Sequence, residues 1–140
     1  MPAAYAAVEP GTAIEPRTYR ITRLDLVKYC GASGDFNVIH WNERVARSVG
    51  LPNVIAHGMY TMAQAGKFVT EWVGDPGAIT DFGVRLSAMV PVPDDDEGAT
   101  LEVSGKVLEK LADNKVTVDI VVKAGGAKVL TRARATVRLP

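Results

Sequence analysis

The sequence predicts an α+β fold in which an antiparallel sheet wraps around one long buried helix. Three observations predict it: a nearly continuous apolar stretch from His57 to Trp72, several later runs of alternating apolar and polar residues, and turn residues between those runs. A helix without a polar face is normally buried, and strict alternation favours half-buried strands. The length of 140 residues fits one compact domain.

The composition narrows the class of protein. Sixteen basic residues balance sixteen acidic residues, and 47% of all residues are hydrophobic. A chain with this hydrophobic content should fold. Because its net charge is zero, it has no overall electrostatic field that would attract nucleic acid or an anionic membrane. No stretch reaches the roughly 18 apolar residues of a membrane span, and the first residues do not resemble a secretion signal. We expect a cytoplasmic protein with no nucleic-acid or membrane partner.

The first part of the chain predicts a lead-in, a strand and a helix. Residues 1–16 contain three prolines and no sustained periodicity, which predicts an extended lead-in. A strand is predicted near Arg17. Thr22 can cap a helix that Gly31 and Gly34 would end. The single cysteine of the chain cannot form an internal disulfide, and a small apolar residue on this helix is the favoured interpretation of it.

Two further helices are predicted before the sheet. The segment from Asn42 to Val49 begins with a capping residue and is followed by Gly50. The stretch from His57 to Trp72 is apolar or small on nearly every side, so we expect this helix to be buried. Its small residues, Ala63 and Gly66, would allow a sheet to pack closely against it.

The remainder of the chain predicts strands. Residues 78–90 form one, and three alternating runs follow, at 101–107, 116–122 and 129–138, with turn residues at 113–114 and 125–126. In the last run we expect Thr131 to face the core, and Arg132 to face solvent. A sheet of this size must curl around the long helix to cover it. We therefore predict a single hot-dog domain over residues 1–140.

Asp35 and His40 are the strongest candidates for chemistry. They lie five residues apart in a glycine-containing segment between two predicted helices, and segments held between rigid elements commonly carry function. Histidine exchanges a proton near neutral pH, and a carboxylate beside it can orient a water or stabilise the charged imidazole. The structural alternative makes Asp35 a turn residue and His40 a hydrogen-bonded, partly buried histidine.

The start of the long helix offers a second candidate site. Gly58 follows His57 there, and unpaired N–H groups and the helix dipole favour a developing negative charge. A glycine would let a carbonyl oxygen approach the backbone closely. The alternative for Gly58 is tight packing between helix and sheet. For His57 we favour a structural role, such as capping the helix or shaping the loop.

The motif around these residues resembles a known family. The run YCGASGDFNVIH at residues 29–40, followed by Ala46 and by AHGM at residues 56–59, resembles the hydratase 2 motif of the MaoC-like family. Members of that family are hot-dog folds that act on (R)-3-hydroxyacyl and trans-2-enoyl thioesters. The motif match covers about residues 20–75, and the Gly-Asp-x-Asn-x-x-His core is specific. The family usually has proline where this chain has Val38.

The resemblance implies a reaction and a role for each site residue. The reaction is (R)-specific dehydration of 3-hydroxyacyl thioesters to trans-2-enoyl thioesters, or the reverse hydration, in fatty-acid or mycolic-acid elongation. His40 would act as general base or acid, Asp35 would polarise the water or hydroxyl, and the Gly58 N–H would bind the thioester oxygen. Asn37 and His57 would support the site. No metal or redox cofactor is implied, and the acyl group would be carried on CoA or acyl carrier protein (ACP).

A narrower likeness concerns AHGM and the segment VTEWVGDPGA at residues 69–78. Both are similar to HadB-type catalytic subunits of the actinobacterial (3R)-hydroxyacyl-ACP dehydratase. This likeness implies a heterodimer with a homologous hot-dog subunit that helps to form the acyl channel. A homodimer is the alternative, because a small hot-dog chain exposes a sheet edge that tends to pair.

Several residues and functions remain open. Tyr60 and Met62 could line the acyl path or simply pack, and three arginines could contact a phosphate or an acidic carrier or remain a solvated face: Arg85, Arg132 and Arg134. A hot-dog acyl thioesterase is one alternative function, although it would not need Asp35, His40 and Gly58 together. A non-catalytic acyl-channel subunit is another, although such a subunit has no use for the acid–base pair.

Overall fold

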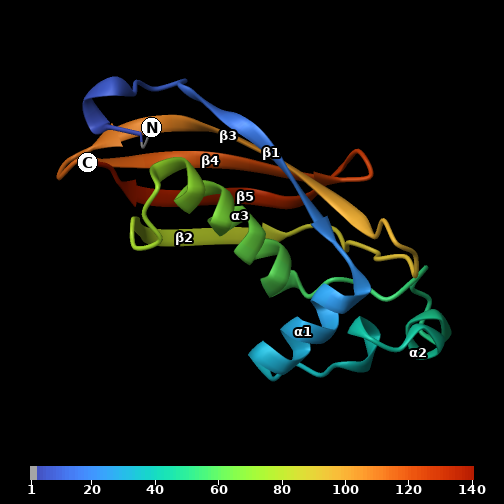
Figure 1. The fold of residues 1–140 in the computed structure, drawn as a ribbon. Coiled ribbons are helices and arrows are strands. Elements are labelled where there is room, and N and C mark those ends of the chain that lie inside the picture. Colours follow the sequence, from blue (N-terminus) through green and yellow to red (C-terminus); the bar gives the residue numbers. More distant parts are fainter. Residues whose placement is uncertain (1–2) are drawn as a thin grey trace.

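The computed structural model describes residues 3–140, which form one five-stranded antiparallel sheet with a long helix lying along one face (Figure 1). The strand order is β1-β3-β4-β5-β2, so β1 and β2 are the two edges. In chain order the elements are η1 (Tyr5–Ala7), β1 (Ala13–Ile21), α1 (Arg23–Ser33), η2 (Val38–His40), α2 (Glu43–Ser48), α3 (Gly58–Val73), β2 (Ile79–Leu86), β3 (Ala99–Leu111), β4 (Lys115–Ala124) and β5 (Ala127–Arg138), where η marks a short 3₁₀ helix.

The predicted hot-dog arrangement of a sheet around a helix is present, with α3 as the helix. Its buried side includes Ala65, Phe68 and Val69, which pack in one apolar core with the inward residues of the sheet. The packing is close: a Cβ added at Gly105 of β3 would lie 3.0 Å from the Phe68 ring. A Cβ at Gly66 would lie 3.3 Å from the Phe82 ring of β2, so a small residue here allows the close approach that the sequence predicts.

The prediction that α3 is buried on every side is wrong. Met59, Ala63 and Lys67 are exposed, and only one face of the helix meets the sheet. A single sheet layer covers one face of a helix, and the described residues include no second layer over the other. Met59 and Ala63 on that open face are therefore exposed in the described part of the chain.

The helix ends follow the predicted chemistry. Thr22 caps α1 and forms a reciprocal capping box with Asp25, and Gly34 ends the helix in the left-handed conformation at φ 75°. Asn42 caps α2 through its side chain, which accepts from the Val45 N–H at 3.1 Å. Gly31 does not end a helix; α1 continues through it to Ser33.

Two predicted boundaries are corrected by the structure. The lead-in of residues 1–16 is too long, because β1 begins at Ala13 and a short 3₁₀ helix forms at residues 5–7; residues 1–2 lie outside the described part. The strand predicted over residues 78–90 ends at Leu86, and the chain then leaves the sheet edge, with one isolated bridge between Ile55 and Pro91.

The last three strands form the predicted meander with one irregularity. The hairpin turns use left-handed residues at Asp113 and Asn114, as the turn residues predict. The prediction that inward and outward residues alternate strictly along β5 is wrong at the centre of the strand. The register shifts there, and Arg132 has φ 48°. This β-bulge turns Leu130 inward and pairs Thr131 with the exposed Arg85, so the core takes leucine where the alternation predicted threonine.

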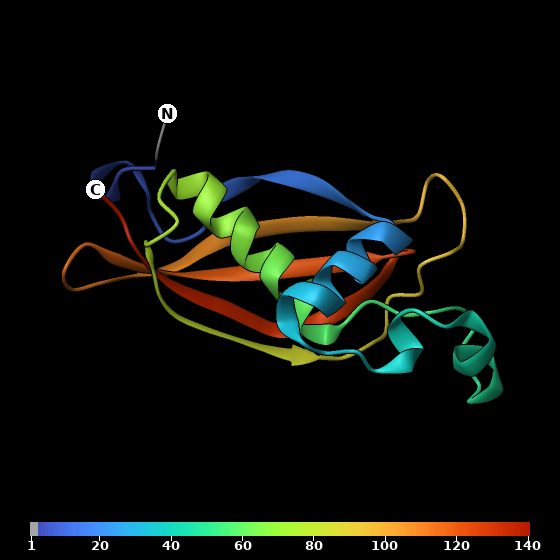
Figure 2. The same cartoon turned by 60° about the horizontal axis from the view of Figure 1, so that its bottom comes forward.

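The fold gathers the candidate residues at one end of α3. Helix α1 lies on the same side of the sheet as α3, near the first turn of α3, and α2 lies farther out at that end of the molecule (Figures 1 and 2). None of the helices formed by residues 3–140 combines the length and apolar character needed to cross a bilayer.

Candidate active site

His40 is held with one ring nitrogen bonded and the other free. It lies in η2 with 7% of its surface exposed, and its Nδ1 is 2.6 Å from the main-chain oxygen of Ile55. A carbonyl oxygen can only accept, so Nδ1 carries the proton in this bond. The Nε2 atom of the neutral ring then has a free lone pair and can accept a proton.

Asp35 presents one carboxylate oxygen toward that nitrogen. Its Oδ1 accepts the N–H of Asn37 at 3.1 Å, which orients the carboxylate, while Oδ2 lies 4.0 Å from His40 Nε2. That distance is too long for a direct hydrogen bond. It leaves room for a water or a hydroxyl group that both residues contact. The Asp35 side chain is 52% exposed, so the carboxylate also reaches solvent.

Asn37 shapes the loop that joins these two residues. Its side-chain oxygen accepts the Ile39 N–H at 3.4 Å, and its main-chain oxygen accepts the His40 N–H at 3.0 Å. Both bonds tighten the turn that carries the imidazole. The role of Asn37 in supporting the reaction stays a prediction.

His57 lies beneath the pair. Its ring stacks on the His40 ring with centroids 3.8 Å apart, and its Nε2 contacts the main-chain oxygen of Asp35 at 3.2 Å and the Cys30 sulfur at 3.5 Å. His57 occupies the N-cap position of α3, but its side chain makes no cap bond. Of the two structural roles predicted for it, the geometry fits shaping the loop.

Burial sets the protonation states of His57 and Cys30. Burial lowers the pKa of His57, and the nearby His40 lowers it further, against opposing contributions from Asp35. Burial also raises the pKa of the Cys30 thiol, and the Asp35 charge adds to that effect. Both residues are therefore uncharged near neutral pH. Cys30 is buried on α1 as the sequence predicts, and a protonated thiol is a poor nucleophile.

Gly58 and His40 form part of the wall of one cavity. The cavity measures about 200 Å³, and its other walls are mainly apolar, including Leu86, Met89 and Leu130. Gly58 begins α3, and within residues 3–140 its N–H donates to no protein atom. A Cβ added at Gly58 would overlap the Leu86 side chain, so the packing alternative for this glycine also has support. Asp35 reaches the site from beside His40 and does not line the cavity.

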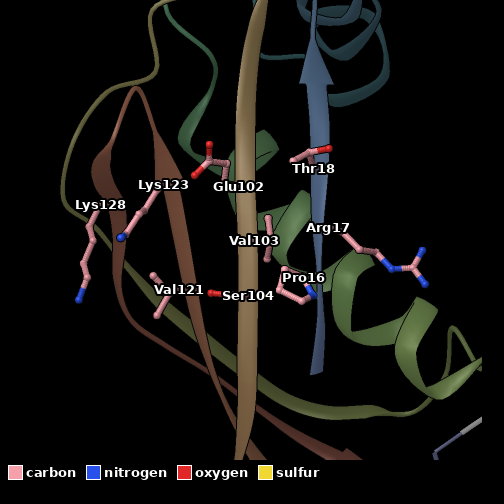
Figure 3. A pocket seen from close by; sticks show the side chains of 9 residues that line it. All are labelled: Pro16, Arg17, Thr18, Glu102, Val103, Ser104, Val121, Lys123 and Lys128. Atoms are coloured by element: carbon pink, nitrogen blue, oxygen red, sulfur yellow. The ribbon is translucent and has the colours of Figure 1, made fainter. Parts of the chain in front are cut away.

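A larger groove lies elsewhere, along β1, β3, β4 and β5 (Figure 3). Its volume is about 650 Å³, and its charged side chains are Arg17, Glu102, Lys123 and Lys128. It contains no imidazole and only one carboxylate, so it offers no acid–base pair. The smaller cavity beside His40 is therefore the candidate active site.

The same residues are arranged poorly for a metal ion. The ligand atoms of Asp35, His40 and His57 lie within 4.8 Å of one another. The two rings are stacked, however, with 22° between their planes. Their in-plane lone pairs then point side by side instead of toward one point, whereas zinc needs them to converge at about 2.1 Å. The geometry fits acid–base chemistry better, and the expectation that no metal is needed remains a prediction.

Some site residues could not be found from the sequence. Tyr60 and Met62 do not line the cavity; Thr61 does, and Tyr60 packs edge-on against Tyr29. The carbonyl that fixes the His40 tautomer belongs to Ile55, and main-chain atoms leave no signal in side-chain patterns. The three arginines proposed for carrier contact are all exposed: Arg85, Arg132 and Arg134. Arg134 forms an ion pair with Asp119 at 3.5 Å.

Comparison with known proteins identifies related sequences. The family described as "MaoC like domain" matches residues 6–125. A fatty acid synthase subunit beta from Aspergillus oryzae is 32% identical over 126 residues, which cover 85% of this chain and 6% of that protein. A 3-hydroxyacyl-thioester dehydratase X from Mycobacterium tuberculosis is 48% identical over 44 residues, 31% of this chain and 16% of that protein. The chain thus spans a small part of each of these relatives.

Solved structures agree on the fold. A MaoC-like dehydratase is 40% identical with a TM-score of 0.94, and the match covers 99% of this chain and 43% of that one. An R-hydratase from Pseudomonas aeruginosa is 28% identical with a TM-score of 0.85, over 98% and 85% of the two chains. The HadBC (3R-hydroxyacyl-ACP dehydratase) complex from Mycobacterium tuberculosis is 15% identical with a TM-score of 0.71, over 93% and 97%. At that identity the last likeness shows the fold alone, so it does not establish the narrower HadB resemblance.

Proposed function

The chain belongs to the MaoC-like domain family, and from this premise we propose that it interconverts (R)-3-hydroxyacyl and trans-2-enoyl thioesters. One observation supports the proposal most. His40 and Gly58 both line the apolar cavity. His40 has a free Nε2 lone pair with a carboxylate 4.0 Å away, and the Gly58 N–H has no partner among the described residues. Hydration or dehydration of a thioester needs three groups: a proton acceptor, a group that positions the water or hydroxyl, and a hydrogen-bond donor to the thioester oxygen.

In dehydration, His40 Nε2 takes the proton from the α-carbon. The electron pair of that C–H bond forms the new double bond, the C–O bond at the β-carbon breaks, and the hydroxyl group leaves as water with the proton that His40 Nε2 has just accepted, which returns the imidazole to its neutral form. Asp35 Oδ2 holds the departing hydroxyl group in the 4.0 Å gap. Hydration is the reverse sequence, in which the same two groups position and deprotonate the attacking water.

The Gly58 N–H stabilises the negative charge that develops on the thioester oxygen. It begins α3, so the helix dipole adds to the hydrogen bond. Removal of one such donor often costs about 3 kcal/mol at the transition state. The cavity walls formed by Leu86, Met89 and Leu130 would receive the first carbons of the acyl chain.

The direct test uses crotonyl-CoA with the purified chain. We expect the enoyl absorbance to disappear without release of free thiol, and the product to be the (R)-3-hydroxy thioester. Release of thiol would instead indicate a thioesterase and would contradict the proposal. The His40→Ala variant is the matched control for contaminating hydratase activity.

Gly58→Ala should lower kcat/KM for hydration roughly tenfold, because the added Cβ hinders approach of the substrate oxygen to the main-chain donor. The added methyl group also overlaps Leu86. The double variant Gly58→Ala, Leu86→Ala separates the two effects, because it removes the overlap and leaves the methyl group beside the donor. Full recovery of kcat/KM in the double variant would show that Gly58 serves packing only.

For the finer function we propose a dehydratase of fatty-acid or mycolic-acid elongation that works as a dimer. Three exposed apolar residues beside the catalytic loop line a shallow pocket together with Cys30: Val27, Phe36 and Trp41. Val38 of the same loop is also exposed. Such a surface favours a protein partner. The local 48% identity to the mycobacterial 3-hydroxyacyl-thioester dehydratase X supports the dehydration reaction. A HadB-type subunit with a homologous partner is proposed from the likeness of residues 56–59 and 69–78, and a homodimer is the alternative.

A chain-length series of trans-2-enoyl thioesters, on CoA and on ACP, tests the finer function. Hydration of short chains by the chain alone would indicate a self-sufficient homodimer. Hydration of long chains only after a co-purifying homologue is added would indicate a shared acyl channel. Size-exclusion chromatography with light scattering gives the oligomeric state in each case.

A further inference from the structure

His57 has more contacts with the catalytic loop than capping or packing requires. It is 1% exposed, and its ring is enclosed on several sides by the stacked His40 ring, the edge-on Tyr29 ring at 4.6 Å and the Cys30 sulfur. Its Nε2 also contacts the Asp35 main-chain oxygen. One side chain therefore touches both members of the acid–base pair, and it belongs to a different element from either of them.

The hydrogen bonds determine the tautomer of His57. The Asp35 carbonyl oxygen can only accept, so the bond at 3.2 Å requires a proton on His57 Nε2. The other nitrogen, Nδ1, is buried and has no hydrogen-bond partner among residues 3–140. A neutral ring leaves only a lone pair at that position, which costs less in an apolar surrounding than an unpaired N–H would. The two stacked histidines therefore have opposite tautomers: Nδ1–H in His40 and Nε2–H in His57.

We infer that His57 is a positioning residue that anchors the Asp35 main chain against His40, and that it does so as a neutral ring that donates through Nε2. This inference rests on the proposed function. The anchor acts on the residue that carries the carboxylate: the Asp35 carbonyl is fixed by His57, and Asp35 Oδ1 is fixed by the Asn37 N–H. Together these bonds leave Oδ2 directed at His40. Without the anchor, the half-exposed Asp35 side chain is free to turn toward solvent.

Burial opposes protonation of His57 most strongly and His40 adds to that effect, while the carbonyl and the charge of Asp35 act in the opposite direction. A second proton would lie on Nδ1, where no acceptor is available, and the charge would stack against His40. The titratable groups that face the ring are Asp35, His40, Cys30 and Tyr29, and Asp35 presents its main-chain carbonyl at 3.2 Å and its carboxylate within 4.8 Å. The lowered pKa of His57 agrees with this arrangement.

Variants at position 57 test the anchor through activity. Glutamine places an amide N–H near the position of Nε2, whereas leucine fills similar space without a donor. We expect His57→Leu to lower kcat about tenfold to a hundredfold with KM within about threefold, since a small displacement of a reacting group has costs of this size. His57→Gln should recover most of that loss. Cys30→Ala is the matched control, because it removes the other Nε2 contact and leaves the Asp35 bond intact.

The comparison must separate positioning from stability. Thermal unfolding of each variant gives the folded fraction, and kcat is then expressed per folded molecule. Equal kcat for His57→Leu and wild type would overturn the inference, and so would a His57→Gln variant as slow as His57→Leu at equal stability. If wild type itself does not hydrate enoyl thioesters, the proposed function fails, and the tautomers are then judged by spectroscopy alone.

Nitrogen-15 NMR provides that independent reading. The chain has only two histidines, so tag-free protein labelled on the imidazole nitrogens gives two sets of ring signals, and His57→Gln assigns them. We expect an Nδ1–H pattern for His40 and an Nε2–H pattern for His57. As the pH is lowered below about 6.5, the usual value for histidine, the His57 signals should stay those of the neutral ring. An Nδ1–H pattern or an ordinary titration of His57 would overturn the inference.

Discussion

Replacement of His40 by alanine should lower kcat for enoyl thioester hydration by at least about a hundredfold. The change removes the Nε2 lone pair that accepts the proton, and general acid–base groups commonly contribute a hundredfold or more. It also removes the bond to the Ile55 carbonyl, so some loss of stability is expected as well. Steady-state kinetics with crotonyl-CoA, corrected for the folded fraction from thermal unfolding, measures the effect.

His40→Gln is a useful companion to the alanine variant. It retains hydrogen-bonding capacity and most of the volume but has no group that titrates near neutral pH. We expect it to be more stable than His40→Ala and comparably slow. Near wild-type turnover in both variants would remove His40 from the mechanism.

Asp35→Asn should also lower kcat at least about a hundredfold, with the fold preserved. Asparagine keeps an oxygen that can accept the Asn37 N–H, so the turn should survive. The amide group that replaces Oδ2 carries no negative charge and presents donors where a leaving hydroxyl or attacking water needs an acceptor. The 52% exposure of the side chain suggests that little stability depends on its charge.

The control for Asp35 is an exposed carboxylate far from the site. Asp75 follows the far end of α3, so Asp75→Asn should leave kcat unchanged. Unaltered hydration by Asp35→Asn would contradict the assignment of Asp35 and would leave His40 as the only acid–base group. Equal losses in both aspartate variants would point to a general charge effect instead.

Local rules predicted most of the elements. Helix α1 begins and ends where Thr22 and Gly34 require it, and the two hairpins turn at residue pairs that adopt the left-handed conformation readily. The segment that holds Asp35, Asn37 and His40 was also predictable, because turn residues between helices are visible in the sequence. These features depend on neighbours within a few positions along the chain.

Features set by distant contacts were not predictable. The bulge at Arg132 depends on the pairing of β5 with two strands at once, and a periodic pattern contains no such information. The exposed face of α3 depends on how many layers cover it. The stacking of His57 on His40 joins residues 17 positions apart along the chain, and the Ile55 carbonyl that fixes His40 has no side-chain signature.

The two bonds from His40 and His57 to peptide oxygens have a consequence for how such a site can diversify. Peptide oxygens are present whatever residues occupy positions 35 and 55, so no point substitution of a partner side chain can delete them. The tautomers of His40 and His57 are therefore preserved when the surrounding side chains change. Lineages, or directed-evolution libraries, can vary Leu86, Met89 and Leu130 to accept new acyl groups without having to re-evolve the base.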